Sequence, residues 1–591
     1  MSVPVFSFGT DRGYAHVQAR GSDRLPTGGR YTVQGCHGAG TVLGSSFVST
    51  SSDLARALSL YEGSADDLGS SIRGSLTIYL EDNRSGELLI LSDPFGSSTV
   101  FLYKTELTTL ISSSLVSLTS LAKSDGKPLK KSLKYAAMLA SSNNGGLVDS
   151  PYEGVRVLGQ FKYISISTAG VSEKEYSIQD DIFSIDLFRP QSAELLRERV
   201  KQDIVANISA ASRYPSSRYI CHLTGGMDSR TVLAGLISSG YENKYVLHCG
   251  GDPLADDMQI SRRLASAFDL QISYDSGLEV GVLSGSPVVD SKWSMHETAG
   301  LLRGPANPGL RQSDAVVLSG GFGGLLRNSF GLPLATVPSD GFDARCLMKP
   351  MLGALGEQDG HGNSVLNGEL RIHALERLSQ VQERAKTLGV PNEALPEFVW
   401  FSFRSRYYVG EISRSLSKYV NRFDPLYSPW MLALAWSYSR QERALNFAHL
   451  DLIVDIHEEL AMMPYDKERI TSAYLDARPN LTMGALPQSQ APMKRNSLAA
   501  APFNLGLGNT AISSEQFESA RKIGLPPATV AYSELYRSRC LEFIEELGKE
   551  ELSQYFNFEH LYKLVANPPK WRPQYRSIRD LHDVLSWYLD E

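Results

Sequence analysis

One short segment of the sequence combines residue types that could bind a phosphate group. It reads Thr224-Gly225-Gly226-Met227-Asp228-Ser229. The hydroxyl groups of Thr224 and Ser229 can donate hydrogen bonds to phosphate oxygens, and the Asp228 carboxylate can hold a Mg²⁺ ion that bridges those oxygens. Glycine has no side chain, so the backbone at these positions can approach a ligand closely. The combination predicts a phosphate-binding loop, whereas a plain strand-to-helix turn needs none of these polar residues.

The elements on either side predict how this loop is positioned. A β run over residues 219–223 stops just before the loop, and a helix over residues 229–239 follows it. The start of a helix presents backbone N–H groups that have no partner within the helix, and the helix dipole favours an anion there. We therefore expect the loop to aim several amides at the phosphate.

Strands and helices continue to alternate along this half of the chain. Runs typical of strands occupy residues 245–249, 271–274 and 315–318, and a helix is predicted over 255–268. Such alternation indicates βαβ units and a parallel sheet with helices on both faces. Beyond about residue 365 the pattern is almost entirely helical. Three acidic residues in this half are interpreted mainly as the beginning of a helix: Asp252, Asp256 and Asp257.

The first 180 residues follow a different pattern, with short strands separated by turns. Residues 75–80 alternate in polarity, a polar turn follows at 82–86, and 87–91 form a second apolar run, which predicts a hairpin. After residue 180 apolar side chains recur at helical spacing, at Leu196, Val200, Ile204 and Ile208, behind the candidate cap Ser192. The sequence therefore predicts a mostly β domain over residues 1–185 and an α/β domain with a helical half over residues 186–591.

Composition excludes several classes of protein. The chain has 591 residues, of which 42% are hydrophobic and 21% are charged, as in ordinary folded proteins. The formal net charge is −7 without a Lys/Arg-rich run, so no nucleic-acid partner is expected. The five cysteines are scattered, which argues against a disulfide scaffold and a structural zinc site. With no apolar stretch of about 20 residues and no signal-peptide pattern, we expect a cytoplasmic protein without a membrane partner.

Several motifs together resemble one family of enzymes. The phosphate-binding segment resembles the pyrophosphate loop of the ATP pyrophosphatases, which cleave ATP between the α and β phosphates. Stretches near the N-terminus resemble class II glutamine amidotransferase domains: Arg73-Gly74, Asp93-Pro94-Phe95-Gly96, Phe101-Leu102-Tyr103 and Ser112-Ser113. The two domains in this order resemble class B asparagine synthetase, β-lactam synthetase and the lasso-peptide cyclases. This resemblance implies an α+β sandwich of the Ntn-hydrolase type followed by a doubly wound ATP pyrophosphatase domain.

The same resemblance implies ATP and Mg²⁺ as cofactors and assigns the residues that bind them. The nucleotide-binding residues are Leu223, Thr224, Gly225, Gly226, Asp228, Ser229, Ser319, Gly320 and Arg327, and Asp228 is also the metal ligand. Two residues receive catalytic roles. Glu297, in a His-Glu-Thr stretch that precedes Arg303, is a carboxylate for metal binding or proton transfer. Lys494 stabilises the anionic transition state.

The chain departs from the pattern of that family in two places. Glutamine-using members begin with a cysteine nucleophile, whereas this chain has Ser2. Glutamine hydrolysis is not expected, because a hydroxyl lacks the thiolate that makes cysteine reactive near neutral pH. In the loop after residue 318, the acidic pair of the family falls on Gly324 and Leu325. Arg327 either supplies positive charge where a metal contact is lost or is a surface residue.

The resemblance implies an ATP-dependent amide ligase that works without glutamine. A substrate carboxylate would be adenylated, releasing pyrophosphate, and an amine of the same or another substrate would displace AMP. The substrate is a small molecule or a peptide, as in lactam synthetases or macrolactam-forming lasso-peptide cyclases, and a homodimer or a biosynthetic partner protein is left open. Three alternatives also stay open: a non-catalytic homologue, a glutamine-dependent amidotransferase, and a tRNA-modifying enzyme that uses the same loop. The absence of a basic face argues against the last.

Overall fold

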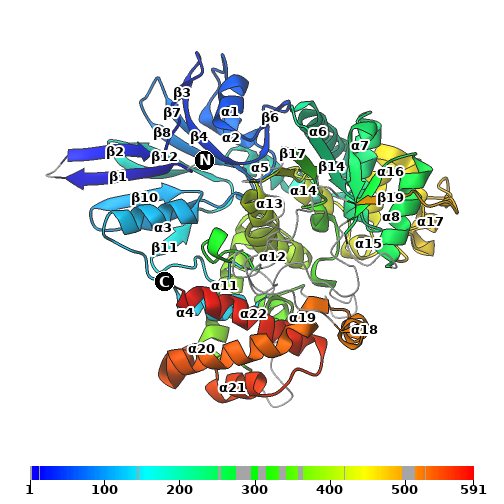
Figure 1. Cartoon of the computed structure of the whole chain (residues 1–591). Helices are drawn as coiled ribbons and strands as arrows, with labels where there is room; N and C mark the ends of the chain where they lie inside the picture. The colour runs from blue at the N-terminus through cyan, green and yellow to red at the C-terminus, as the bar shows by residue number, and fades with distance from the viewer. Residues whose placement is uncertain are drawn as a thin grey trace.

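Three main β-sheets organise the computed structural model of this chain, and helices surround them (Figure 1). The chain is therefore of the mixed α/β class. The structure describes residues 3–11, 14–142, 145–250, 255–274, 295–303, 314–331, 341–353, 355–356, 364–417, 419–495, 513–525 and 527–590.

Two antiparallel sheets form the N-terminal part of the molecule. The first has the order β11 (Val155–Val157), β9 (Phe101–Lys104), β10 (Thr108–Ser112), β1 (Val5–Asp11), β2 (Tyr14–Arg20). The second has the order β13 (Gly170–Glu175), β12 (Lys162–Ser167), β8 (Leu88–Ser92), β7 (Leu76–Asp82), β4 (Tyr31–Gly38), β3 (Leu25–Pro26). One cluster of buried side chains draws on both sheets, including Phe6, Ile111, Tyr79 and Ile164. The predicted hairpin is confirmed as β7 and β8.

The third sheet is entirely parallel among its described strands. Its order is β18 (Asn421–Phe423), β17 (Ala315–Leu318), β14 (Arg218–His222), β15 (Val246–His248), β16 (Ile272–Tyr274), β19 (Met493–Arg495). From β14 the chain first adds β15 and β16 on one side, and then β17 and β18 on the other. The strand order therefore reverses between β14 and β17.

Helices cover this parallel sheet and continue beyond it (Figure 1). Those that follow the predicted positions are α6 (Ala193–Arg213), α7 (Met227–Ser238) and α8 (Asp256–Ala267). Leu196, Val200, Ile204 and Ile208 of α6 are all fully buried, as their spacing predicts. The later helices are α10 (Met348–Met351), α11 (Gly368–Thr387), α12 (Leu395–Arg404), α13 (Glu411–Leu416), α14 (Met431–Trp436), α15 (Arg440–Ala444), α16 (Phe447–Met462), α17 (Ser472–Ala477), α18 (Ser514–Ile523), α19 (Pro527–Ala531), α20 (Ser533–Ser553), α21 (Phe558–Ala566) and α22 (Arg572–Leu589).

The helices of the N-terminal part are short, and one of them meets the C-terminal end of the chain. They are α1 (Ser51–Ala57), α2 (Ala65–Ser70), α3 (Leu115–Ser124), α4 (Leu133–Ser141) and α5 (Ile178–Ile182). Helix α22 packs against α4 (Figure 1), and Lys131 Nζ, just before α4, donates to the Trp587 carbonyl at 2.7 Å. The sheets therefore change from antiparallel to parallel near residue 185, but packing contacts continue across that position. The division into domains at 185 stays a prediction.

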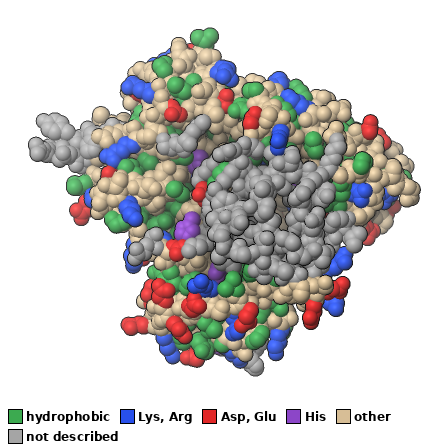
Figure 2. All heavy atoms as spheres, viewed as in Figure 1, with side chains coloured by type: hydrophobic (Ala, Val, Ile, Leu, Met, Phe, Trp, Pro, Cys, Tyr) green, Lys and Arg blue, Asp and Glu red, His purple; other side chains and the backbone are tan. Residues whose placement is uncertain are grey.

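Among the described residues, no helix is long and apolar enough to cross a membrane. On the face shown in Figure 2, Lys and Arg side chains of the described residues are mixed with Asp and Glu side chains.

Candidate functional site

Two loops meet at the point where the order of the parallel strands reverses. The first loop, residues 223–226, connects β14 to α7. The second loop, residues 319–327, follows β17. A Cβ atom on Gly320 would lie 2.9 Å from the Asp228 backbone carbon and 3.0 Å from the Ser229 nitrogen, so the second loop contacts the first turn of α7, directly after the first loop. The predicted nucleotide-binding residues of both loops are thus brought together.

Hydroxyl groups shape the first loop from within. Ser229 Oγ accepts from the Thr224 backbone N–H at 3.0 Å, and Thr224 Oγ1 accepts from the Gly226 N–H at 3.2 Å. Gly226 is the N-cap of α7 and offers no side chain to the helix amides. Leu223 is fully buried, and its N–H donates to the His248 carbonyl of the neighbouring strand at 2.8 Å. In this structure the two hydroxyls hold the loop conformation, and their role in binding a nucleotide stays a prediction.

Contacts with other parts of the protein require glycine at position 225. Its N–H donates to Asp257 Oδ1 at 2.8 Å, and its carbonyl accepts from the Asp466 N–H at 3.1 Å. A Cβ atom on Gly225 would lie 2.6 Å from Asp466 Cβ, which real side chains cannot tolerate. The prediction that Asp256 and Asp257 begin a helix is confirmed, since both lie in the first turn of α8. Asp252 lies outside the described residues.

Four of the nine residues of the second loop are glycines, and these pack closely. Cβ atoms on Gly323 and Gly324 would lie 2.8 Å from the Asp228 carboxyl carbon and 2.7 Å from the Trp400 ring. Leu325 is fully buried. The two positions where the resemblance expects acidic residues are therefore filled by packing, and a carboxylate side chain has no room at Gly324.

Arg327 pairs with Asp228. Its Nη2 atom donates to Asp228 Oδ2 at 2.6 Å. This ion pair is consistent with the interpretation that Arg327 supplies positive charge to the loops. Ser319 Oγ accepts from Arg422 Nη2 at 3.0 Å, which brings a second guanidinium to the same loop. Burial raises the Asp228 pKa above its usual range, and the positive charges of Arg327 and Arg469 partly offset that rise.

His449 faces the other oxygen of the same carboxylate. It is fully buried in α16, and its Nδ1 atom lies 3.7 Å from Asp228 Oδ1. Among the described residues, neither of these two atoms has a hydrogen-bond partner. Burial, followed by the charges of Arg327 and Arg469, lowers the pKa of His449 to about 3, so its ring is neutral near pH 7.

Segments other than the two loops position the predicted catalytic residues Glu297 and Lys494. Glu297 Oε2 accepts from the Tyr419 hydroxyl at 3.1 Å, and its neighbours His296 and Arg303 pair with Asp590 and Asp580 at the C-terminal end of the chain. Lys494 pairs with Ser273 in the backbone register of β19 and β16. That strand is three positions from β14, or about 14 Å at 4.7–4.9 Å per strand. The side chain of Lys494 lies outside the described part.

Sequence patterns alone miss the residues that come from distant segments. Four residues from distant segments contact the two loops or the first turn of α7, or act on Asp228 through their charge: His449, Arg422, Asp466 and Arg469. None of them belongs to a recognisable motif. Only His449 leaves a signal, because it is a polar residue inside the apolar run of α16.

Among the described residues, no group of three or more His, Cys, Asp and Glu side chains could hold a metal ion without other ligands. Neither a protein-family model nor a curated protein sequence matches this chain.

Proposed function

We propose that this protein is an ATP-dependent amide-forming ligase that adenylates a substrate carboxylate and couples it to a substrate amine without hydrolysing glutamine. The observation that carries the proposal is the meeting of the two glycine-containing loops where the strand order of the parallel sheet reverses. In open α/β sheets, ligands bind at the carboxyl ends of the strands at such a point. The fold proposed here is thus a doubly wound pyrophosphatase-type domain behind a sandwich of the Ntn-hydrolase type.

The residues around the loops suit the triphosphate of ATP. The uncapped first turn of α7, a helix of 12 residues, offers backbone amides and the positive end of its dipole. Arg327 and Arg422 add guanidinium groups at the second loop, where charge-assisted hydrogen bonds to phosphate are strong. Together these groups would hold the β and γ phosphates at the surface of the first loop.

The chain's own residues would then stabilise the leaving pyrophosphate. An oxygen of the substrate carboxylate attacks the α-phosphorus, the bond to the β-phosphate oxygen breaks, and an acyl-adenylate and pyrophosphate result. The substrate amine next attacks the acyl carbon and AMP leaves. Asp228, with one buried oxygen unpartnered among the described residues, fits a Mg²⁺ ion that accompanies ATP, and this ion would neutralise charge on the pyrophosphate. Arg327 would add positive charge where the second loop has no carboxylate.

A lysine near the first loop is a second candidate for the cationic role given to Lys494. Lys467 is exposed and follows Asp466, whose N–H bonds to the Gly225 carbonyl. The segment that contains it therefore touches the loop directly. We include Lys467 with Lys494 as candidates for contact with the anionic transition state.

The proposal is tested by following AMP and pyrophosphate with a panel of carboxylic acids, amines and peptides. Asp228→Asn should abolish their release while circular dichroism stays unchanged, because the substitution removes charge and metal ligation at nearly constant volume. Asp256→Asn is the control, since it makes the same change at an exposed position of α8. Release at the wild-type rate in Asp228→Asn would contradict the assignment of the loop.

The ion pair between Arg327 and Asp228 favours one alternative, a homologue that binds nucleotide without cleaving it. The pair neutralises the carboxylate that the metal ion needs, and Gly324 leaves no space for another. ATP binding without AMP formation for any acceptor would support this alternative over the ligase. In the ligase, Arg327→Ala should lower the rate of AMP formation, because a cation facing the pyrophosphate is lost.

A further inference from the structure

The gap between Asp228 and His449 is chemically incomplete. Asp228 Oδ1 and His449 Nδ1 face each other at 3.7 Å, and both atoms are buried without a hydrogen-bond partner among the described residues. A hydrogen bond between nitrogen and oxygen requires about 2.7–3.2 Å, so this contact is too long to be one. Buried polar atoms are satisfied in nearly all native structures, so an unfilled pair indicates a missing group.

Thr231 decides which ring nitrogen of His449 carries the proton. The Thr231 hydroxyl lies 2.9 Å from the Met227 carbonyl and 2.9 Å from His449 Nε2. A carbonyl can only accept, so the single hydroxyl proton goes to Met227, and Nε2–H must donate to Thr231. This assignment follows from the hydrogen-bond network. With Nε2–H directed to Thr231, Nδ1 is the ring nitrogen that faces the gap and can bind a cation there.

The carboxylate presents a second lone pair to the same gap. Asp228 Oδ2 is occupied by Arg327, whereas Oδ1 points to His449. Two facing acceptors repel each other unless a cation lies between them. The nearby guanidinium groups are already paired, Arg327 with Asp228 and Arg469 with Asp466 at 3.4 Å.

We propose that this gap binds a divalent cation that accepts nitrogen ligands, of the class of Mn²⁺, Co²⁺ or Zn²⁺, through Asp228 Oδ1 and His449 Nδ1. Two metal–ligand bonds of about 2.0–2.2 Å can span the observed 3.7 Å without movement of either side chain. Imidazole suits these ions, whereas Mg²⁺ prefers oxygen ligands. This cation would occupy the place given to Mg²⁺ in the proposed function, because both would use the same oxygen of Asp228. Water or nucleotide phosphates complete the coordination, and only the phosphates rest on the proposed function.

The test compares Co²⁺ binding to the full-length wild-type chain and to His449→Gln, without nucleotide, by calorimetry and by the visible spectrum of bound Co²⁺. The glutamine amide can still donate to Thr231 but has no group at the Nδ1 position. We expect the wild type to show one Co²⁺ site more than the variant, or an affinity for that site at least about tenfold higher. His582→Gln is the matched control, because His582 is also buried beside a carboxylate but bonds to it directly, at 3.0 Å.

A second variant keeps the test decisive if His449→Gln does not fold. Thr231→Val removes the hydroxyl that sets the ring tautomer at nearly constant shape, and should weaken Co²⁺ binding about 10- to 100-fold, as loss of an outer partner of a metal ligand does. Thr231→Ser should restore it. Equal Co²⁺ affinity in the wild type and in the folded variants would overturn the inference. Because no nucleotide is present, failure of ATP cleavage alone leaves this result unaffected.

Discussion

Asp256 and Asp257 are adjacent carboxylates in the first turn of α8, but only Asp257 accepts a hydrogen bond from the first loop. Both can interact favourably with the helix dipole. The difference between them is therefore the contact with the Gly225 N–H, at 2.8 Å. A comparison of substitutions at Asp256 and Asp257 can therefore separate the effect of the Gly225 contact from that of the helix dipole.

In the proposed ligase, Asp257→Ala should raise the KM for ATP by about tenfold, because a typical intramolecular hydrogen bond contributes about 0.5–1.5 kcal/mol and about 1.4 kcal/mol is a tenfold change. Asp256→Ala should change the KM by less than about twofold. Initial rates at varied ATP measure both. Equal effects of the two substitutions would show that the dipole, and not the Gly225 contact, is what matters.

Asp93 is a buried carboxylate that depends on donors from both parts of the chain. It accepts from the Ser97 and Ser98 amides at 3.0 and 2.7 Å and from the Tyr427 hydroxyl at 2.8 Å. Burial raises the Asp93 pKa, and these donors counteract the rise because they favour the charged form. The Tyr427 hydroxyl also accepts from the Phe95 N–H at 2.9 Å.

Tyr427→Phe should lower the free energy of unfolding by about 1–3 kcal/mol at neutral pH, because two buried partners lose a hydrogen bond. Loss of a donor also raises the folded-state pKa of Asp93 further. A carboxyl group with a raised folded pKa loses stability as the pH rises from its unfolded value through its folded value. The difference between wild type and variant should therefore widen as the pH rises from the folded-state pKa of Asp93 in the wild type to the higher one in the variant. Urea unfolding over the range from acidic to neutral pH measures it.

Tyr31→Phe provides the comparison, because the Tyr31 hydroxyl donates to the Gly63 carbonyl at 3.0 Å and not to a carboxylate. Its effect on stability should not depend on pH over the same range. A pH-independent difference for Tyr427→Phe would mean that Asp93 stays protonated in both proteins.

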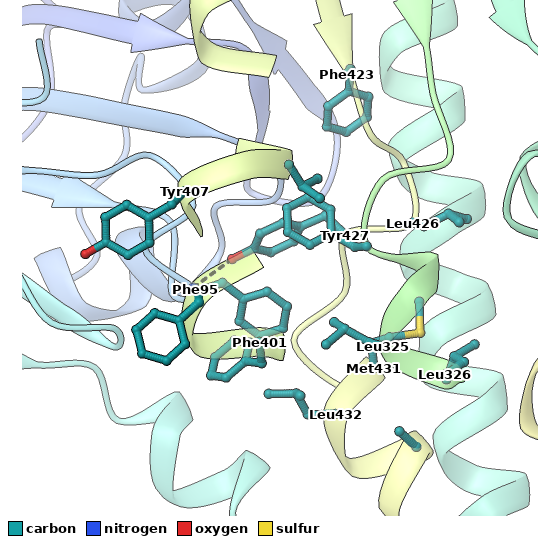
Figure 3. Packing of buried hydrophobic residues seen from close by; sticks show 14 of the residues in the cluster. Phe95, Leu325, Leu326, Phe401, Tyr407, Phe423, Leu426, Tyr427, Met431 and Leu432 are labelled. Atoms are coloured by element: carbon teal, nitrogen blue, oxygen red, sulfur yellow. Dashed lines mark hydrogen bonds between the residues drawn. The ribbon is translucent and has the colours of Figure 1, made fainter. Parts of the chain in front are cut away.

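At the scale of elements, a turn of the N-terminal part supports the second loop. The turn that follows β8 inserts Phe95 among rings of the other part, with ring centroids 4.8 Å from Phe401, 4.8 Å from Tyr427 and 6.2 Å from Phe322 (Figure 3). Phe322 belongs to the second loop and has a left-handed backbone, with φ of 70°. Such a conformation is costly for a residue other than glycine and persists only when its surroundings hold it.

Phe95→Ala should destabilise the fold by about 3–5 kcal/mol, as large-to-small core substitutions do, and should also raise the KM for ATP because Phe322 loses a neighbour. Phe6→Ala is the matched control. Phe6 is equally buried, but it packs against Tyr79 inside the N-terminal sandwich. Chemical denaturation should show a loss of stability in both variants, whereas ATP kinetics should show a raised KM only in Phe95→Ala. If both variants keep the wild-type KM, the turn supports stability only.

At the scale of the whole molecule, the largest hydrophobic cluster does not respect the predicted boundary at residue 185. It extends from Tyr31 and Phe95 through Leu223 and Phe401 to Trp587. Helix α22, at the C-terminal end, packs against α4 of the N-terminal part (Figure 1).

Residues 186–591 expressed alone should therefore fail to form a cooperatively folded protein. They would expose the apolar surface that Phe95, Phe161 and α4 cover, which amounts to several core side chains at about 1.5–3 kcal/mol each. Co-expression of residues 1–185 should rescue solubility. The measurements are sedimentation, near-ultraviolet circular dichroism and thermal unfolding. A cooperative transition of the isolated fragment at the wild-type temperature would contradict this prediction.

Local patterns in the sequence were sufficient to predict the strands and the helix that position the two loops. The strand and helix on either side of the first loop, and the strand before the second loop, lie within two residues of their predicted positions. Two three-residue strands, β18 and β19, were not predicted, because both lie beyond residue 365, where the pattern indicates almost only helices. Ser2 and the side chain of Lys494 lie outside the described residues, so those predictions are unchanged.

The partners inside the site depend on contacts that local patterns cannot contain. Arg327 reaches Asp228 across 99 residues of chain, and His449 reaches Thr231 across 218. Likewise, Gly225 packs against Asp466 and Gly324 packs against Trp400, so a side chain at either position would clash with these neighbours. Hydrophobic periodicity reports which face of one element is buried, but the side chains that meet at the end of a parallel sheet come from separate segments. Their pairing exists only once the strands are in register.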